Sequence, residues 1–166
     1  MRKIQQSFES KSGFEFLILQ QGNFDKNPTS ALSMSSYQQW LGYAFERFCR
    51  KYHRVIAAIL GFSAVKYRSG VYFKQGTDGQ KGFQIDLLFD RDDKVITVCE
   101  IRYLNSPVST GVIADCEERM QLLPNQSNKT IHRVLISNYG PSDALIKRAY
   151  FDRFILIDDL FNEEYW

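Results

Sequence analysis

Hydrophobic residues in the first half of the chain recur at the spacing of one long helix. From Ser36 to about Gly61, apolar side chains return every three or four positions, as one buried helical face requires. The residues from Ser36 to Gln39 fit a capping box, and glycine commonly follows the last turn of a helix. The pattern predicts a first helix between Ser36 and Gly61.

Three strands are expected next. The run from Val65 to Phe73 alternates and is rich in β-forming residues, and a glycine-rich segment separates it from a second run, Phe83–Phe89. The five polar residues Asp90–Lys94 then lead into a third run, Val95–Tyr103. The short polar connection predicts that the second and third runs pair as an antiparallel hairpin.

The remaining pattern alternates helix and strand. We expect a helix over residues 110–123, a buried strand over 131–137, a helix over 143–150 and a short strand over 154–157. The order αβββαβαβ is typical of an α/β fold in which helices flank a mixed central β-sheet.

We expect two parts of unequal size. Residues 1–36 form an N-terminal segment and linker, in which Phe14–Leu19 is an edge strand or docking segment, and residues 37–166 form the folded domain.

Composition narrows the possible functions. The chain has 166 residues, with 21 Lys and Arg against 19 Asp and Glu, so any nucleic-acid contact must come from a local patch. Neither the P-loop nor the dinucleotide-binding fingerprint is present. Three widely separated cysteines lack zinc-ligand spacing, and no run approaches a membrane span. These features predict a soluble, cytoplasmic protein with reduced thiols.

Charged residues interrupt the hairpin strands at three positions. Asp86 lies between Ile85 and Leu87, whereas Glu100 and Arg102 flank Ile101. Because side chains alternate along a strand, Glu100 and Arg102 share one face.

The register of the hairpin decides whether the two acids meet. A turn centred on Asp92 places Gln84 opposite Glu100 and Asp86 opposite Val98, so that Asp86 lies diagonal to Glu100. Two neighbouring carboxylates repel each other unless a hard divalent cation such as Mg²⁺ or Mn²⁺ lies between them. The pattern indicates metal-assisted attack on a phosphodiester, with a cationic side chain to stabilise charge.

These residues resemble a known group of enzymes. Asp86 on one strand and Glu100-Ile101-Arg102 on the next are similar to motifs II and III of the PD-(D/E)XK nuclease superfamily. The blocks Gly42–Cys49, Gly82–Leu88 and Val98–Arg102 more narrowly resemble the C-terminal nuclease-like domain of prokaryotic AAA-type ATPases, and the closing Asp158–Phe161 also fits.

The resemblance implies a restriction-endonuclease-like core and assigns roles to residues. Glu46 takes the place of the motif I acid, Asp86 and Glu100 those of the metal ligands, and Gln84 lies beside them. Arg102 stands where the family has lysine, and an arginine stays protonated and cannot act as a base. The implied partners are DNA and an AAA-type ATPase, either fused or separate, and the chain could form oligomers.

Other interpretations of these residues remain open. Glu46 precedes Arg50 by four residues, which is the spacing of an exposed helical ion pair. The charges of the hairpin could form a structural salt-bridge network. The domain could also have lost cleavage and serve for docking to nucleic acid or protein, or for oligomerisation beside an ATPase. A basic and aromatic strip on the first strand, from Lys66 to Lys74, is either a nucleic-acid contact or a solvated face.

Overall fold

The computed structural model describes residues 34–76, 79, 81–125 and 127–166. The predicted strand or docking segment at residues 14–19 and most of the predicted linker lie outside these ranges. No helix in the described ranges is long and apolar enough to cross a membrane.

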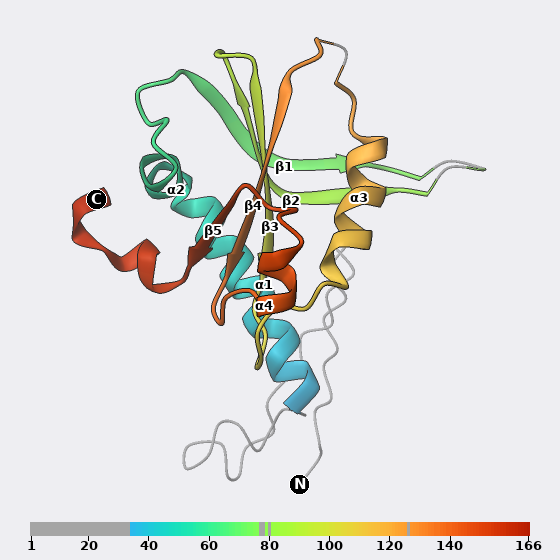
Figure 1. Cartoon of the computed structure of the whole chain (residues 1–166), viewed down its shortest axis with the longest axis vertical. Coiled ribbons are helices and arrows are strands. Elements are labelled where there is room, and N and C mark those ends of the chain that lie inside the picture. Colours follow the sequence, from blue (N-terminus) through green and yellow to red (C-terminus); the bar gives the residue numbers. More distant parts are fainter. Residues whose placement is uncertain (1–33, 77–78, 80, 126) are drawn as a thin grey trace, which may run out of the picture. The chain divides into compact units, whose positions relative to one another are not determined.

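The described chain forms helices on a five-stranded sheet (Figure 1). The helices are α1 (Met34–Lys51), α2 (His53–Ile59), α3 (Val112–Leu122) and α4 (Asp143–Lys147). The strands are β1 (Tyr67–Lys74), β2 (Phe83–Arg91), β3 (Val95–Arg102), β4 (Thr130–Ser137) and β5 (Arg153–Leu156). Two short 3₁₀ helices, η2 (Asp158–Phe161) and η3 (Glu163–Tyr165), follow.

The sheet is mixed, as the sequence predicts. Its strand order is β1-β2-β3-β4-β5, antiparallel from β1 to β3 and parallel from β3 to β5. The prediction of an α/β fold, with a mixed central sheet flanked by helices, is therefore confirmed. One detail was wrong: the predicted first helix is two helices, because the chain leaves regular α-helix at Tyr52.

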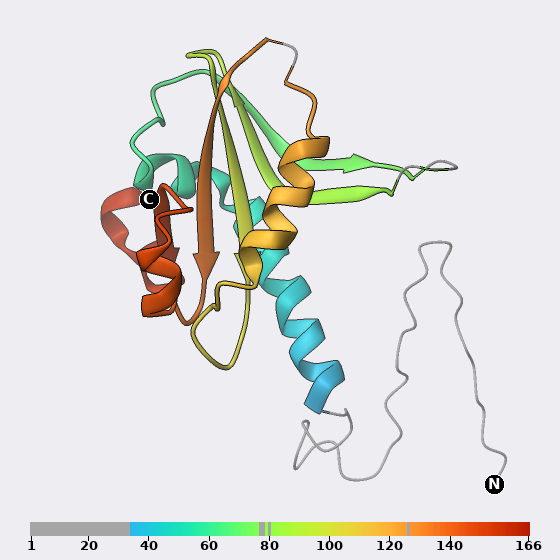
Figure 2. The same ribbon diagram turned by 45° about the vertical axis from the view of Figure 1, so that its right-hand side comes forward.

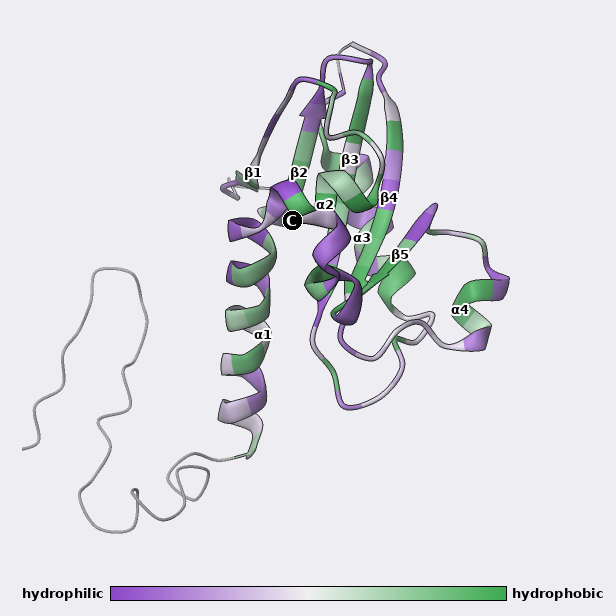
Figure 3. Ribbon diagram, turned by 90° about the vertical axis from the view of Figure 1, so that its left-hand side faces the viewer, coloured by the Kyte–Doolittle hydropathy of each residue, from purple (hydrophilic) through white to green (hydrophobic). Residues whose placement is uncertain are grey.

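Apolar layers cover both faces of the sheet. On one face, α1 and α2 pack through Phe45, Cys49 and Ile56 in a cluster that also contains Phe89 of β2 and Ile101 of β3. On the other face, α3 and α4 pack on a separate set of strand residues. Figure 3 shows α1 and α4 on opposite sides of the strands. The three cysteines are free and buried within these layers, in agreement with the predicted reduced thiols.

A β-bulge changes the facing of β2 at Asp86. Residues two positions apart in a regular strand share a face. Ile85, however, belongs to the cluster under α3, whereas Leu87 belongs to the cluster under α1 and α2. In the pairing with β1, Gly70 faces Leu88 and Tyr72 faces Ile85, so Val71 alone lies opposite Asp86 and Leu87. A bulge bends its strand and redirects side chains, and bulges are frequent beside active sites.

The predicted register of the hairpin was wrong by two residues. Leu88 pairs with Val98 and Leu87 with Cys99, so one further step of this ladder would set Asp86 directly opposite Glu100. The cause is the turn, in which Lys94 adopts a positive φ of 63° and shifts the centre of the hairpin beyond Asp92. Asp86 and Glu100 are therefore closer in the observed register than in the predicted one, in which they were diagonal.

The sheet divides immediately beyond this point. The β2–β3 pairing ends at Leu87 and Cys99. Beyond this pair, the first part of β2 remains paired with β1 and the last part of β3 remains paired with β4. Figures 1 and 2 show the β1–β2 arm turning away from β3 and passing beside α3. We call this opening, with Asp86 on one side and Glu100 on the other, the fork.

We predict that the layer under α1 and α2 dominates stability. Phe89→Ala should lower the free energy of unfolding by about 3 to 5 kcal/mol, because Phe89 is fully buried and its removal leaves a cavity. Phe73→Ala is a matched control on the neighbouring strand, since Phe73 is 67% exposed, and should change it by about 0.5 kcal/mol or less. Chemical denaturation measures both, and equal effects would contradict this core.

Candidate functional site

The fork places two buried carboxylates at the point where the sheet opens. Asp86 is 8% exposed and Glu100 is 5% exposed, although both are charged residues on central strands. Ionised carboxylates are rarely buried to this extent unless a partner compensates their charge. The partners of each acid therefore decide what the site can do.

Two arginines hold Glu100. Arg119 of α3 donates from Nη2 to Oε1 at 3.0 Å and lies with Nη1 3.0 Å from Oε2, so its planar guanidinium engages both carboxylate oxygens. Arg102, two positions along β3, places Nη2 2.5 Å from Oε1. Paired guanidinium and carboxylate groups of this kind are among the strongest hydrogen-bonded ion pairs in proteins.

Helix α3 supplies the part of the site that sequence reasoning missed. Arg119 fixes its own side chain by donating from Nε to the backbone oxygen of Asp115, and the Asp115 carboxylate lies 3.7 Å from Arg102. Burial, and then the adjacent Glu100 carboxylate, raise the pKa of the Cys116 thiol to about 12, so Cys116 is not a thiolate nucleophile at neutral pH. The available signal was the spacing of Asp115, Cys116 and Arg119, which lie within about one helical turn.

Asp86 has fewer side-chain partners than Glu100 among the described residues. The side chain of Gln84 donates to its Oδ1 at 3.3 Å. No ion pair of Asp86 occurs within 4.0 Å in the part of the chain that the structure describes. Gln84 therefore lies beside Asp86 and orients one of its two carboxylate oxygens.

Glu46 has a nearby arginine and a perturbed pKa. It forms the predicted helical ion pair, with Arg50 Nη1 3.4 Å from its Oε2. Its pKa is also raised, first by burial and then by the charge of Asp86, while Arg102 contributes in the opposite direction. The charges of Asp86 and Arg102 therefore act on Glu46, and α1, which carries it, packs on the face of the sheet opposite α3.

Burial governs the charge of the central acid. It raises the pKa of Glu100, against the opposing effects of Arg102 and Arg119 and together with a smaller contribution from Asp86. Counted with full formal charges, the four acids and three arginines around the fork carry a net charge of −1. They are Glu46, Asp86, Glu100 and Asp115 against Arg50, Arg102 and Arg119.

The fork contains carboxylate oxygens, which are the ligand type that a hard divalent cation takes. Among the described residues, no group of three His, Cys, Asp or Glu side chains stands ready to enclose a metal ion. Mg²⁺, however, is commonly held by only one or two carboxylates, with water and substrate phosphate as its other ligands. Asp86 and Glu100 offer such a pair, but both oxygens of Glu100 are engaged by guanidinium groups.

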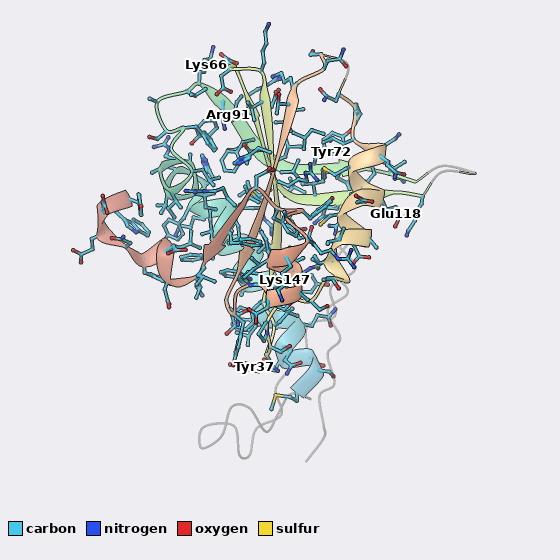
Figure 4. The ribbon with its side chains drawn as sticks, in the orientation of Figure 1. Tyr37, Lys66, Tyr72, Arg91, Glu118 and Lys147 are labelled. Atoms are coloured by element: carbon cyan, nitrogen blue, oxygen red, sulfur yellow. The ribbon has the colours of Figure 1, made fainter. Side chains whose placement is uncertain are left out.

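Two of the three basic residues in the strip considered on the first strand lie beside acids. Arg68 donates to Asp90 at 2.6 Å, and Lys66 lies 4.0 Å from Asp92. Tyr72 is partly buried and packs on Phe83, whereas Phe73 beside it is 67% exposed. Figure 4 shows Lys66 and Tyr72 at different ends of the strand region. The first strand thus does not present one continuous basic and aromatic surface.

Comparisons with known proteins give similarities of structure. No family model matches the chain, and no curated protein does so either. The fold is similar to that of a protein of unknown function, AF1548, with a TM-score of 0.44 and 17% identity over 68% of this chain and 65% of that chain.

Two endonuclease structures are also similar. A repair endonuclease from Pyrococcus abyssi has a TM-score of 0.45 and 12% identity, covering 76% of this chain and 48% of that chain. The MspJI restriction endonuclease, in complex with a 27-mer oligonucleotide, has a TM-score of 0.43 and 17% identity, covering 78% of this chain and 31% of that chain. This chain spans less than two thirds of the length of each of the three structures.

We predict that Arg119 contributes more to folding than Arg102. Arg119→Ala should lower the free energy of unfolding by about 3 kcal/mol, because it leaves a buried carboxylate without its two-point partner. Arg102→Ala should cost about 1 kcal/mol or less, because its side chain is 34% exposed and Arg119 remains.

A double variant separates lost charge pairing from lost packing. Adding Glu100→Gln to Arg119→Ala removes the uncompensated charge and should restore a large part of the stability. Urea unfolding of the four proteins measures this. Equal losses for the two arginines, or no recovery in the double variant, would contradict the assigned roles.

Proposed function

We propose that this chain is a nuclease-like domain that acts on the phosphodiester backbone of DNA with a divalent cation, Mg²⁺ or Mn²⁺. The observation that carries the proposal is the pair of buried carboxylates, Asp86 and Glu100, at a bulge where the sheet opens. A structural salt bridge alone would not require the second acid, Asp86, to be buried with Gln84 as its one side-chain hydrogen-bond partner among the described residues.

Asp86 and Glu100 would hold the cation, with Glu46 assisting from α1. A cation bound there supplies charge stabilisation and lowers the pKa of a water molecule. Gln84 keeps the Asp86 carboxylate oriented through its 3.3 Å hydrogen bond. Glu46, whose pKa is raised by burial and by Asp86, would accept a hydrogen bond or proton from water near the fork.

Arg102 has a different role from the lysine that the resemblance would supply. A lysine can lose its proton when buried and then act as a base, whereas arginine keeps its charge. The guanidinium of Arg102 is one-third exposed and therefore accessible to a phosphate oxygen. It stabilises negative charge on the phosphate and does not deprotonate water.

A docking module that binds DNA without cleaving it is the second candidate. It is favoured by the arginines on Glu100, which already compensate the charge that a metal ion would otherwise balance. In this alternative, the fork recognises the phosphate backbone or a protein partner and performs no hydrolysis. The resemblance to the ATPase-linked domains supports an AAA-type ATPase as that partner, and assembly into an oligomer through it.

DNA cleavage assays test the choice between the two candidates. Plasmid, linear and single-stranded DNA are incubated with Mg²⁺ or Mn²⁺, and products are separated by electrophoresis. Asp86→Asn and Glu100→Gln should each reduce cleavage by at least about 100-fold, because even residues behind metal ligands cost about 10 to 100-fold. Glu117→Gln, an exposed acid of α3, is the matched control and should leave the rate unchanged.

Arg102→Lys distinguishes weak cleavage from lost cleavage. If the fork is catalytic, lysine restores a group that can lose its proton and should raise the rate by about tenfold or more. If the wild type, Arg102→Lys and Glu117→Gln are all inert while DNA still binds, hydrolysis is excluded and the docking module is correct. Absence of both cleavage and DNA binding would contradict both candidates.

A further inference from the structure

The arginines on Glu100 stand in the way of a cation. Arg119 spans both carboxylate oxygens and Arg102 shares one of them. A cation cannot coordinate Glu100 closely while two positively charged groups occupy its oxygens, since like charges at that range repel strongly. Metal binding at the fork therefore requires that at least one guanidinium leave Glu100.

The net charge of the fork indicates which group replaces Glu100 as the partner of Arg102 and Arg119. The fork carries a formal charge of −1 as described above. A divalent cation alone would make it +1 and a phosphodiester alone would make it −2, whereas both together leave it neutral. A buried site tolerates the neutral combination best, because uncompensated charge in low dielectric is costly.

The geometry of the arginines suits a phosphate group. A guanidinium that binds two carboxylate oxygens presents the same pair of donors that recognises two phosphate oxygens. Solvent reaches both arginine side chains. The side chain of Arg119 is 17% exposed and that of Arg102 is 34% exposed, whereas the side chain of Glu100 is 6% exposed. Arg119 remains anchored to the backbone oxygen of Asp115 through Nε, which leaves its two terminal nitrogens to exchange partners.

We propose that Arg119 and Arg102 exchange Glu100 for a DNA phosphate, so that phosphodiester and divalent cation bind the fork cooperatively. This inference rests on the proposed function and states the order in which phosphate and cation bind. The phosphate draws the guanidinium groups off Glu100, and the freed carboxylate joins Asp86 in holding the cation. Without nucleic acid, the two arginines stay on Glu100 and prevent the cation from binding at the fork.

One test measures the release of the arginines without any metal. Binding of a short fluorescent DNA duplex is measured by anisotropy in the presence of a chelator. Glu100→Gln removes the competitor for both arginines and should tighten binding by about tenfold. Asp86→Asn removes the same charge from the same site but frees no arginine that the structure pairs with it, and should tighten binding by about threefold or less.

A second test measures the coupling. Titration calorimetry gives the affinity of Mn²⁺ for the full chain alone and with the saturating duplex, whose integrity is checked afterwards on a denaturing gel. The duplex should raise the Mn²⁺ affinity by about tenfold or more, within the usual range of coupling between sites. Arg119→Gln should raise the affinity for Mn²⁺ alone, because a competitor is gone, and should reduce the effect of the duplex.

Two further variants guard against a folding defect. Arg119→Lys keeps the charge but loses the planar guanidinium with its paired donors. It should bind the duplex more weakly than wild type while remaining folded by circular dichroism. Lys147→Gln removes an exposed positive charge from α4 and should leave both affinities and their coupling unchanged. Figure 4 shows Lys147 on this separate helix.

The outcomes separate the two proposals. If Mn²⁺ and duplex both bind but neither alters the affinity of the other, the exchange is wrong and the proposed function stands. The same holds if Glu100→Gln and Asp86→Asn tighten duplex binding equally. If neither ligand binds the wild type alone or together, the proposed function itself fails.

Discussion

The ion pair between Glu100 and Arg119 is the interaction on which the arrangement of the fork depends. A carboxylate that is 5% exposed on a central strand must have its charge compensated, and Arg119 supplies that compensation from a helix on the face of the sheet. The pair thereby ties α3 to β3 at the point where β2 departs. Stability and chemistry compete for the same two oxygens, because any ligand of the fork must first loosen a contact that helps to hold the fold.

The β-bulge at Asp86 gives the fork its second acid. Without it, Ile85 and Leu87 would share a face, and Asp86 would point away from both. The bulge turns Ile85 under α3 and Leu87 under α1, which leaves Asp86 at the change of face, where its charge helps to raise the pKa of both Glu46 and Glu100. One inserted residue therefore converts a regular hairpin strand into an opening that charged groups reach from two layers.

Much of the fold follows from local patterns in the sequence. The alternation of the strands and the short polar turn after Asp90 predict the mixed sheet, and burial of its strands on both faces explains their apolar runs. The position of the hairpin register could not be obtained in this way, because it depends on the positive φ of Lys94 and on a bulge that no periodicity reveals. The division of the first helix at Tyr52 is a similar local event.

The candidate site was only partly predictable for a different reason. Interruption of apolar strands by Asp86, Glu100 and Arg102 is visible in the sequence, and two of these residues do prove to be buried. Arg119, however, lies on a helix whose charged residues resemble a solvated surface, and only the packing of α3 brings it to Glu100. The residues that control a buried charge come from distant parts of the chain, so their identity depends on tertiary structure.

Crystals of the protein with a short DNA duplex, grown with and without Mn²⁺, give the most direct measurement, because manganese is located by its anomalous scattering. We expect manganese between Asp86 and Glu100 in the complex, with Arg119 on a phosphate oxygen. Soaking Mn²⁺ into crystals without DNA should leave Arg119 on Glu100 and much weaker metal density. A complex in which Arg102 and Arg119 stay on Glu100 and no manganese lies at the fork would contradict the account.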